Sequence, residues 1–303
     1  LILMSGVFAE HDSSRFEIYA YSYGATRHGE IREQLAKQVD KFSDILGVTN
    51  LDVVTQARAH GLDIAVDLKG YTQNTRSALF AYRLAPIQIN YLGYPSTMGA
   101  NFIDYIVADA TVIPEEQREH YSESIIYLPH SYLPNDSTRK IPDSTITRAD
   151  FSLPEDVFVF CCFNNNYKLS PREFDIWMRL LQKVDESVLW LLRSNRWAED
   201  NLCKEAEARG VDASRIVFAE RAPHAEHLAR HRLADLFVDT FNCNAHTTAS
   251  DALWAGLPVV TKPGEQFSAR VAASLLNAIG LHELIADTEE AYEALALELA
   301  INK

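Results

Sequence analysis

The sequence predicts an α/β fold built from two halves, each with its own parallel β-sheet. Short apolar runs alternate with longer amphipathic stretches along the chain, a pattern typical of parallel strands joined by helices. The alternation occurs twice, and a polar segment without periodicity, residues 134–150, lies between the two series. A length of 303 residues also suits two domains. We therefore predict two doubly wound domains, residues 1–140 and 141–303.

Each half has its own series of strands and helices. In the first half, strands are expected at residues 16–21, 63–68, 87–92 and 103–108, and helices at 30–39, 52–60 and 76–82. In the second half, strands are expected at 157–163, 188–192, 216–218, 236–239 and 259–261, and helices at 172–183, 197–209, 225–230, 248–255 and 269–278. Ligands of doubly wound sheets bind outside the carboxyl ends of the strands, so the loops that follow strands are the places to search.

Composition excludes several classes of protein. Acidic residues outnumber basic residues by 42 to 28, and the formal net charge is −14. Such a charge repels a nucleic-acid backbone but still permits a local pocket for one diphosphate. No run approaches the roughly 18 apolar residues of a membrane helix, and the four cysteines follow neither a CxxC nor a disulfide-framework pattern. We therefore expect a cytoplasmic protein that binds neither nucleic acid nor membrane.

The most informative run, residues 242–251, follows a predicted strand and opens a predicted helix. Free backbone N–H groups and the helix dipole make such a junction an anion site, and threonine hydroxyls add donors. A diphosphate would lie at His246, Thr247 and Thr248, and Asp251, one turn into the helix, would reach a ribose hydroxyl. The alternative is an ordinary helix N-cap, where Thr and Asp are common.

A second run, residues 163–171, lies at the carboxyl end of strand 157–163. Its Lys168 can neutralise the charge that builds on a leaving diphosphate. The alternative is a solvated, asparagine-rich loop with an incidental lysine.

A third run, residues 221–230, places His227 and Arg230 three residues apart on one helix face, where they could stack on or hydrogen-bond to a base. The alternative is an amphipathic helix whose polar side chains face water. His224, His227 and His231 have i,i+3 and i,i+4 spacing, but neither an HExxH pattern nor a third ligand follows. No Asp-x-Asp occurs either, so we expect no metal.

In the first half, residues 91–100 end a strand in a loop rich in glycine and proline. Gly93 would let a ligand approach the backbone closely. A simple turn is the alternative.

Together and in this order, these runs resemble the catalytic region of O-linked N-acetylglucosamine transferases of bacterial type, in the superfamily that also holds SPINDLY. The matching segments cover most of the chain: 67–72, 85–100, 102–109, 162–171, 187–193, 222–230, 234–239, 244–261 and 263–274. The resemblance implies a GT-B fold, two Rossmann-like domains that face a cleft, with the N-terminal domain incomplete at its start. It also implies transfer of N-acetylglucosamine from UDP-GlcNAc to Ser or Thr hydroxyls of proteins, with inversion and without cofactor or metal.

The resemblance assigns roles to the phosphate-side residues. Lys168 would contact the diphosphate and help the leaving group. His246, Thr247 and Thr248 would hold the phosphates. Asn165 stands where animal members have a glutamine and would also lie at the nucleotide.

The resemblance likewise places the nucleoside and the sugar. Ala222 and Arg230 would address uracil, His227 would pack on the base and Asp251 would bind ribose. His224 stands where animal members often have a lysine near the ribose. In the first half, the backbone of Leu92 and Gly93 would contact the sugar.

The chain also departs from the family pattern. The catalytic His-Pro loop of the family would precede residue 1, as would the tetratricopeptide repeats that select protein acceptors. Two other readings therefore stay open. One is a SPINDLY-like protein O-fucosyltransferase that uses GDP-fucose, and the other is a catalytically incomplete module that binds sugar nucleotides.

Overall fold

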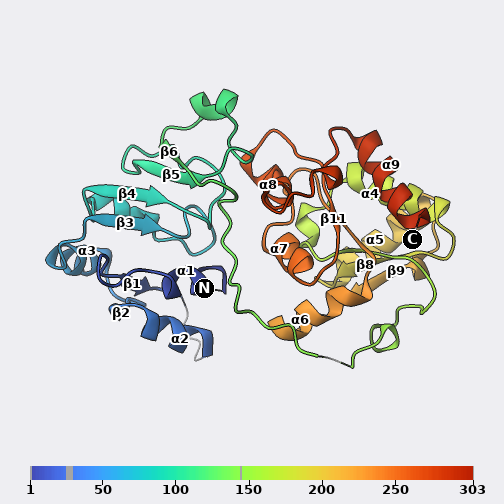
Figure 1. Ribbon diagram of the computed structural model, residues 1–303, viewed down its shortest axis with the longest axis horizontal. Coiled ribbons are helices and arrows are strands. Elements are labelled where there is room, and N and C mark those ends of the chain that lie inside the picture. Colours follow the sequence, from blue (N-terminus) through green and yellow to red (C-terminus); the bar gives the residue numbers. More distant parts are fainter. Residues whose placement is uncertain (1, 25–29, 144, 303) are drawn as a thin grey trace. The chain divides into compact units, whose positions relative to one another are not determined.

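The computed structural model (Figure 1) describes residues 2–24, 30–143 and 145–302, which form two compact units, Leu1–Arg139 and Lys140–Lys303. All strand pairs are parallel in both units. This arrangement confirms the predicted α/β class.

Unit 1 contains two parallel sheets, β1-β2 and β3-β4-β5-β6. Its strands are β1 (Tyr19–Ser22), β2 (Lys41–Asp44), β3 (Ile64–Asp67), β4 (Ile87–Asn90), β5 (Tyr105–Ala108) and β6 (Ser124–Tyr127). Its α-helices are α1 (Ser5–Ala9), α2 (Glu30–Gln38) and α3 (Asn50–Ala59), and its 3-10 helices are η1 (Ile2–Met4), η2 (Ser77–Tyr82) and η3 (Glu115–His120). Apolar side chains of α3, β3 and η2 share one buried cluster, which includes Val53, Ala65 and Phe80.

Unit 2 is built on one five-stranded sheet in the order β11-β10-β7-β8-β9. Its strands are β7 (Val159–Cys162), β8 (Val188–Leu192), β9 (Ile216–Ala219), β10 (Leu236–Val238) and β11 (Val259–Val260). Its α-helices are α4 (Pro171–Lys183), α5 (Arg196–Ala208), α6 (His224–Arg230), α7 (Thr247–Trp254), α8 (Val271–Ala278) and α9 (Glu289–Ile301). Its 3-10 helices are η4 (Arg148–Phe151), η5 (Asn166–Lys168), η6 (Ala213–Arg215), η7 (His231–Leu233), η8 (Phe267–Ala269) and η9 (His282–Leu284).

The central strands of unit 2 are buried on both faces because their sequences are apolar throughout. Every residue of β7 and β10 is buried, as expected of a parallel sheet that helices cover on both sides. Helix α4 begins where the sequence provides a capping box, in which Ser170 and Glu173 exchange hydrogen bonds, with Pro171 at the first helical position. The capped start of α4 fixes the end of the β7–α4 loop that adjoins the helix.

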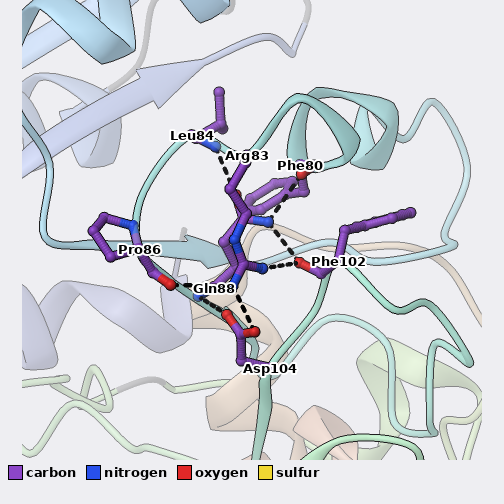
Figure 2. A network of polar contacts seen from close by, with 7 residues as sticks. All are labelled: Phe80, Arg83, Leu84, Pro86, Gln88, Phe102 and Asp104. Carbon is purple, nitrogen blue, oxygen red and sulfur yellow. Dashed lines mark hydrogen bonds and ion pairs between the residues drawn. The ribbon is translucent and has the colours of Figure 1, made fainter.

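Side-chain hydrogen bonds join the end of η2 to strands β4 and β5 in unit 1 (Figure 2). The Gln88 side chain, fully buried on β4, accepts from the Leu84 N–H at 2.8 Å and donates to the carbonyls of Phe80 at 2.9 Å and Phe102 at 2.5 Å. Arg83 donates to Asp104 at 2.7 Å. The network supplies side-chain partners to the Leu84 N–H and the Phe102 carbonyl, and it adds a second donor to the Phe80 carbonyl, which also accepts from the Arg83 N–H.

Several elements differ from the sequence prediction. The predicted helix 76–82 is the 3-10 helix η2, and Arg83, just after it, adopts a left-handed φ of 58°. Strands β2 and β6 and helix α9 were not predicted. Strand β2 has exposed charged residues at both ends, so its apolar signal is too weak to stand out.

Candidate functional site

The strand order of unit 2 creates a switch point between β7 and β10. From β7 the chain proceeds to β8 and β9 on one side, then returns to β10 and β11 on the other side. Where the direction of winding reverses, the loops after the two central strands separate and leave a crevice at their carboxyl ends. These loops contain two of the three runs singled out in this half of the sequence, around Lys168 and around His246.

Lys168 connects the two loops. It ends η5, and its ammonium group donates to the Asn244 carbonyl at 2.6 Å, in the loop that precedes α7. The Thr248 hydroxyl donates to the Asn164 side chain at 2.6 Å and ties the first turn of α7 back to the loop after β7. The structure therefore brings Lys168 and the residues 246–248 into one site within unit 2.

His246 is neutral near pH 7 and is oriented by one hydrogen bond. Burial and the positive charge of Lys168 lower the pKa of His246 to about 4. Its Nε2 lies 2.9 Å from the Ser268 carbonyl, which can only accept, so Nε2 carries the hydrogen. The ring then presents a lone pair at Nδ1, and anion donors at this position come from backbone N–H groups of α7 and from Lys168.

The helix α6 holds a second group of predicted residues. Arg230 is 1% exposed, donates to the Glu220 carbonyl at 2.5 Å and to Nδ1 of His227 at 2.6 Å, and lies 4.5 Å above the Phe163 ring. Burial, with the charges of His231 and Arg230, lowers the pKa of His227 to about 3. His227 is therefore a neutral ring whose Nδ1 accepts from Arg230, which leaves the hydrogen on Nε2.

Four further nucleotide candidates lie in or near this helix. His224 Nε2 lies 3.5 Å from a carboxylate oxygen of Asp251, which joins α6 to α7. Asp251 is 3% exposed. Asn165 accepts a 3.3 Å hydrogen bond from Arg221, and Ala222 is partly exposed in the loop between β9 and α6. Unit 2 thus contains all ten predicted residues outside the sugar pair.

The sequence analysis did not predict a buried polar network that lies next to these residues. Asp239 directly follows β10 and is fully buried, and its Oδ1 accepts from the backbone N–H groups of Thr240 at 2.8 Å and Ala245 at 2.6 Å. Asn164 donates to Thr240 Oγ1 at 2.8 Å. The signal available in the sequence was a polar residue directly after an apolar strand, but Asp239 had been counted as the last residue of that strand.

The predicted sugar-contact residues lie in unit 1, after β4. Leu92 has a left-handed φ of 72°. A Cβ added to Gly93 would lie 2.2 Å from the Leu68 carbonyl oxygen, so the chain's own backbone requires glycine here. The glycine at this position is therefore explained by the close approach of the loop after β3, and the contact of its backbone with the sugar stays a prediction.

The described residues contain neither a metal-ligand cluster nor a membrane-spanning helix. No group of three or more His, Cys, Asp or Glu side chains there is arranged to hold a metal ion. In the same residues, no helix is long and apolar enough to cross a membrane.

A doubly wound sheet with a lysine and a helix N-terminus at its switch point is the arrangement typical of nucleotide-binding α/β domains. The chain matches glycosyl transferase family 41 over residues 2–143 and 136–303. It belongs to this family, and the predicted resemblance is confirmed.

Individual relatives agree with this assignment. The chain is 39% identical to the probable UDP-N-acetylglucosamine–peptide N-acetylglucosaminyltransferase SEC of Arabidopsis thaliana, over 99% of the chain and 31% of that protein. It is 29% identical to the UDP-N-acetylglucosamine–peptide N-acetylglucosaminyltransferase of Caenorhabditis elegans, over 98% of the chain and 36% of that protein. The chain thus spans about a third of the length of these relatives.

A solved structure establishes the fold. The K341M mutant of the Thermobaculum terrenum O-GlcNAc transferase superposes with a TM-score of 0.90 at 31% identity, over 98% of this chain and 56% of that one. The GT-B class predicted from the resemblance is therefore confirmed.

Proposed function

We propose that this chain is the donor-binding part of an enzyme that moves N-acetylglucosamine from UDP-GlcNAc to Ser or Thr hydroxyls of proteins with inversion. The family makes it a glycosyltransferase region. The observation that carries the donor assignment is the Lys168 ammonium, fixed 2.6 Å from the Asn244 carbonyl at the switch point of unit 2. A fixed cation beside a helix N-terminus is the arrangement that a leaving nucleoside diphosphate requires.

The donor would lie along the carboxyl edge of the unit 2 sheet. Its diphosphate would contact Lys168 and the first turn of α7, at His246, Thr247 and Thr248. Its base would pack on His227 near Ala222, with Arg230 behind His227, and Asn165 nearby. Its ribose would be bound by Asp251, next to His224. The backbone of Leu92 and Gly93 would contact the sugar.

In the reaction, the acceptor hydroxyl oxygen forms a bond to the anomeric carbon on the face opposite the phosphate, and the hydroxyl proton passes to water. The bond from that carbon to the β-phosphate oxygen breaks, and the electron pair stays on UDP. Negative charge therefore grows beside Lys168 in the transition state, where a preorganised cation stabilises it more than it stabilises the ground state.

We propose that no metal takes part, because Lys168 and the α7 N-terminus supply the positive charge. Calorimetry in EDTA is expected to show UDP binding to the protein. Binding that occurs only after magnesium or manganese is added would contradict this part of the proposal.

The donor itself is tested by turnover of the full-length protein with a peptide acceptor, in parallel with UDP-GlcNAc and GDP-fucose. We expect the peptide to gain the mass of N-acetylglucosamine. The SEC relative, at 39% identity, and a Petunia hybrida relative named SPINDLY, at 28%, both have UDP-N-acetylglucosamine in their names, which supports the first donor. Transfer from GDP-fucose alone would support the SPINDLY-like reading, and UDP binding without transfer would support a binding module.

We also propose that acceptor selection resides in tetratricopeptide repeats upstream and that the enzyme is cytoplasmic. The first point is supported by relatives about three times longer than the matched region. The second is supported by four cysteines that are all free thiols.

A further inference from the structure

Asp239 is a buried carboxylate, and among the described residues no ion pair offsets the free-energy cost of burying its charge. It is fully buried, and among the described residues it forms no salt bridge. Its partners are neutral donors: the N–H groups of Thr240 and Ala245 at Oδ1, and the Thr261 hydroxyl at Oδ2, at 2.7 Å. Burying a charge without a counter-ion is costly, and a neutral side chain would serve a purely structural loop better.

The carboxylate reaches Lys168 through a single peptide group. The Ala245 N–H that donates to Asp239 and the Asn244 carbonyl that accepts from Lys168 belong to the same planar peptide unit. An anion on the N–H side and a cation on the C=O side polarise this unit in the same sense, so the two hydrogen bonds strengthen each other. Rotation of the peptide would break both bonds together.

A second path leads from Asp239 to the first turn of α7. Asn164 donates to Oδ1 of Asp239 at 3.3 Å and to Thr240 Oγ1 at 2.8 Å. These two hydrogen bonds fix the orientation of the Asn164 amide, so that its oxygen accepts from the Thr248 hydroxyl at 2.6 Å. The carboxylate thereby orients groups in both loops of the switch point.

We infer that Asp239 is a positioning residue for the transfer reaction, which sets the place of the Lys168 ammonium through the 244–245 peptide and that of Thr248 through Asn164. The inference rests on the proposed function and adds to it a residue that touches neither donor nor acceptor.

The surroundings of Asp239 predict how kcat should depend on pH. Burial raises the pKa of Asp239 to about 6, against the hydrogen bonds from Thr261, Ala245 and Thr240 and the charge of Lys168. The other titratable groups that act on this site are Cys162 at the end of β7, Tyr292 on α9 and His246 before α7. Burial keeps Cys162 and Tyr292 protonated by raising their pKa values, and it keeps His246 neutral by lowering its pKa to about 4. We expect kcat to fall as pH drops through about 6, and this limb to be absent in Asp239→Asn.

A double-mutant cycle with Lys168 separates positioning from general damage. Asp239→Asn should lower kcat roughly 10- to 100-fold, the typical cost of a misplaced catalytic group. In a Lys168→Ala background the same change should cost at least severalfold less, because Lys168, one of the two groups that Asp239 positions, is absent. Equal losses in the two backgrounds would overturn the inference, as would an unchanged kcat in Asp239→Asn.

Asp235→Asn is the matched control, because Asp235 immediately precedes β10 as Asp239 immediately follows it. Asp235 binds Arg148 and the Val159 N–H, away from the switch point. The Asp235→Asn substitution should leave kcat nearly unchanged, and its small effect on kcat should be the same in the wild-type and Lys168→Ala backgrounds. Thr261→Val provides a milder second variant should Asp239→Asn not fold, and it should lower kcat a few-fold in the wild-type background and by less in the Lys168→Ala background.

Hydrogen–deuterium exchange keeps this test independent of the proposed function. Asp239→Asn should speed exchange in residues 240–248, whereas Asp235→Asn should not. Unchanged exchange in that segment overturns the positioning role whatever the activity. Faster exchange in a protein whose wild type neither binds UDP nor transfers sugar would leave the positioning of Lys168 standing and sink the proposed function.

Discussion

Lys168 combines two properties that a catalytic cation requires, a fixed position and access to the crevice. Its ammonium is held by the Asn244 carbonyl, yet the side chain is only partly buried. Truncation should therefore reduce the rate more than it reduces donor binding, since the charge on the leaving phosphate grows only in the transition state.

We expect Lys168→Ala in the full-length enzyme to lower kcat by about 10²–10³, or about 3–4 kcal/mol, and to weaken UDP-GlcNAc binding less. Lys168→Arg should restore little, because a planar guanidinium places its charge differently from a compact ammonium. Steady-state kinetics on a peptide acceptor measure the effect. Lys183→Ala is the control, since Lys183 pairs with Glu293 at the end of α4. A Lys168→Ala enzyme with more than half the wild-type kcat would remove the catalytic assignment.

Buried neutral histidines should make the fold sensitive to acid. Burial lowers the pKa of His231 to about 4 and that of His227 to about 3, whereas the unfolded chain takes up these protons near pH 6.5. The unfolded state therefore binds more protons below pH 6.5, and the free energy of unfolding falls as pH drops from 6.5 towards 4. The raised pKa of Asp239 acts in the opposite sense below pH 6 and offsets part of this loss.

At pH 5.5 each buried histidine should cost on the order of 1 kcal/mol relative to pH 7.5. Urea unfolding of His231→Gln at the two pH values should show a loss smaller by about that amount. The same substitution at His282, which lies on the surface, is the control. An identical pH dependence in His231→Gln and the wild type would show that His231 is protonated equally in both states.

Sequence reasoning located Lys168 and residues 246–248 because both follow apolar strands, and parallel strands bring their carboxyl ends to one edge. It did not locate Asp239 or Asn164, since their roles depend on contacts 75 residues apart in the chain. Local pattern also gave no sign that Arg230 lies beneath His227.

Among the elements, strongly patterned ones were predicted and weakly patterned ones were not. The capping box of α4 and the apolar strands of unit 2 are encoded locally. The 3-10 helix η2 is not, because its conformation depends on the network at Gln88, which joins η2 and strand β4 to the loop before β5 (Figure 2). Tertiary hydrogen bonds override local propensity at this point.

Gln88→Ala should therefore destabilise unit 1 by about 3 kcal/mol, because it removes three hydrogen bonds and leaves the Leu84 N–H without its side-chain acceptor. The carbonyls of Phe80 and Phe102 would keep their hydrogen bonds from Arg83. Thermal and urea unfolding measure the loss. Gln73→Ala, at an exposed glutamine of the loop before η2, should change stability by less than about 0.5 kcal/mol. Equal stabilities of the two variants would mean that water replaces the Gln88 contacts.

At the scale of the molecule, the two units differ in the size of their β-sheets and of their buried apolar clusters. Unit 2 has one five-stranded sheet and one large buried cluster that draws all its members from residues after 150. Unit 1 divides its strands between two sheets and has a smaller cluster. The ten proposed diphosphate and nucleoside residues belong to unit 2, and only Leu92 and Gly93 belong to unit 1.

We therefore expect residues 140–303, expressed alone, to fold and to bind UDP with an affinity within a few-fold of that of the whole chain. The physical reason is that a continuous core and a complete switch point need no residue from unit 1. Circular dichroism and calorimetry in EDTA test the two claims, and Lys168→Ala in the same fragment should weaken UDP binding. The fragment should transfer no sugar, because Leu92 and Gly93 are absent from it. A folded fragment that binds UDP more than about tenfold more weakly than the whole chain would mean that residues of unit 1 contribute to nucleotide binding.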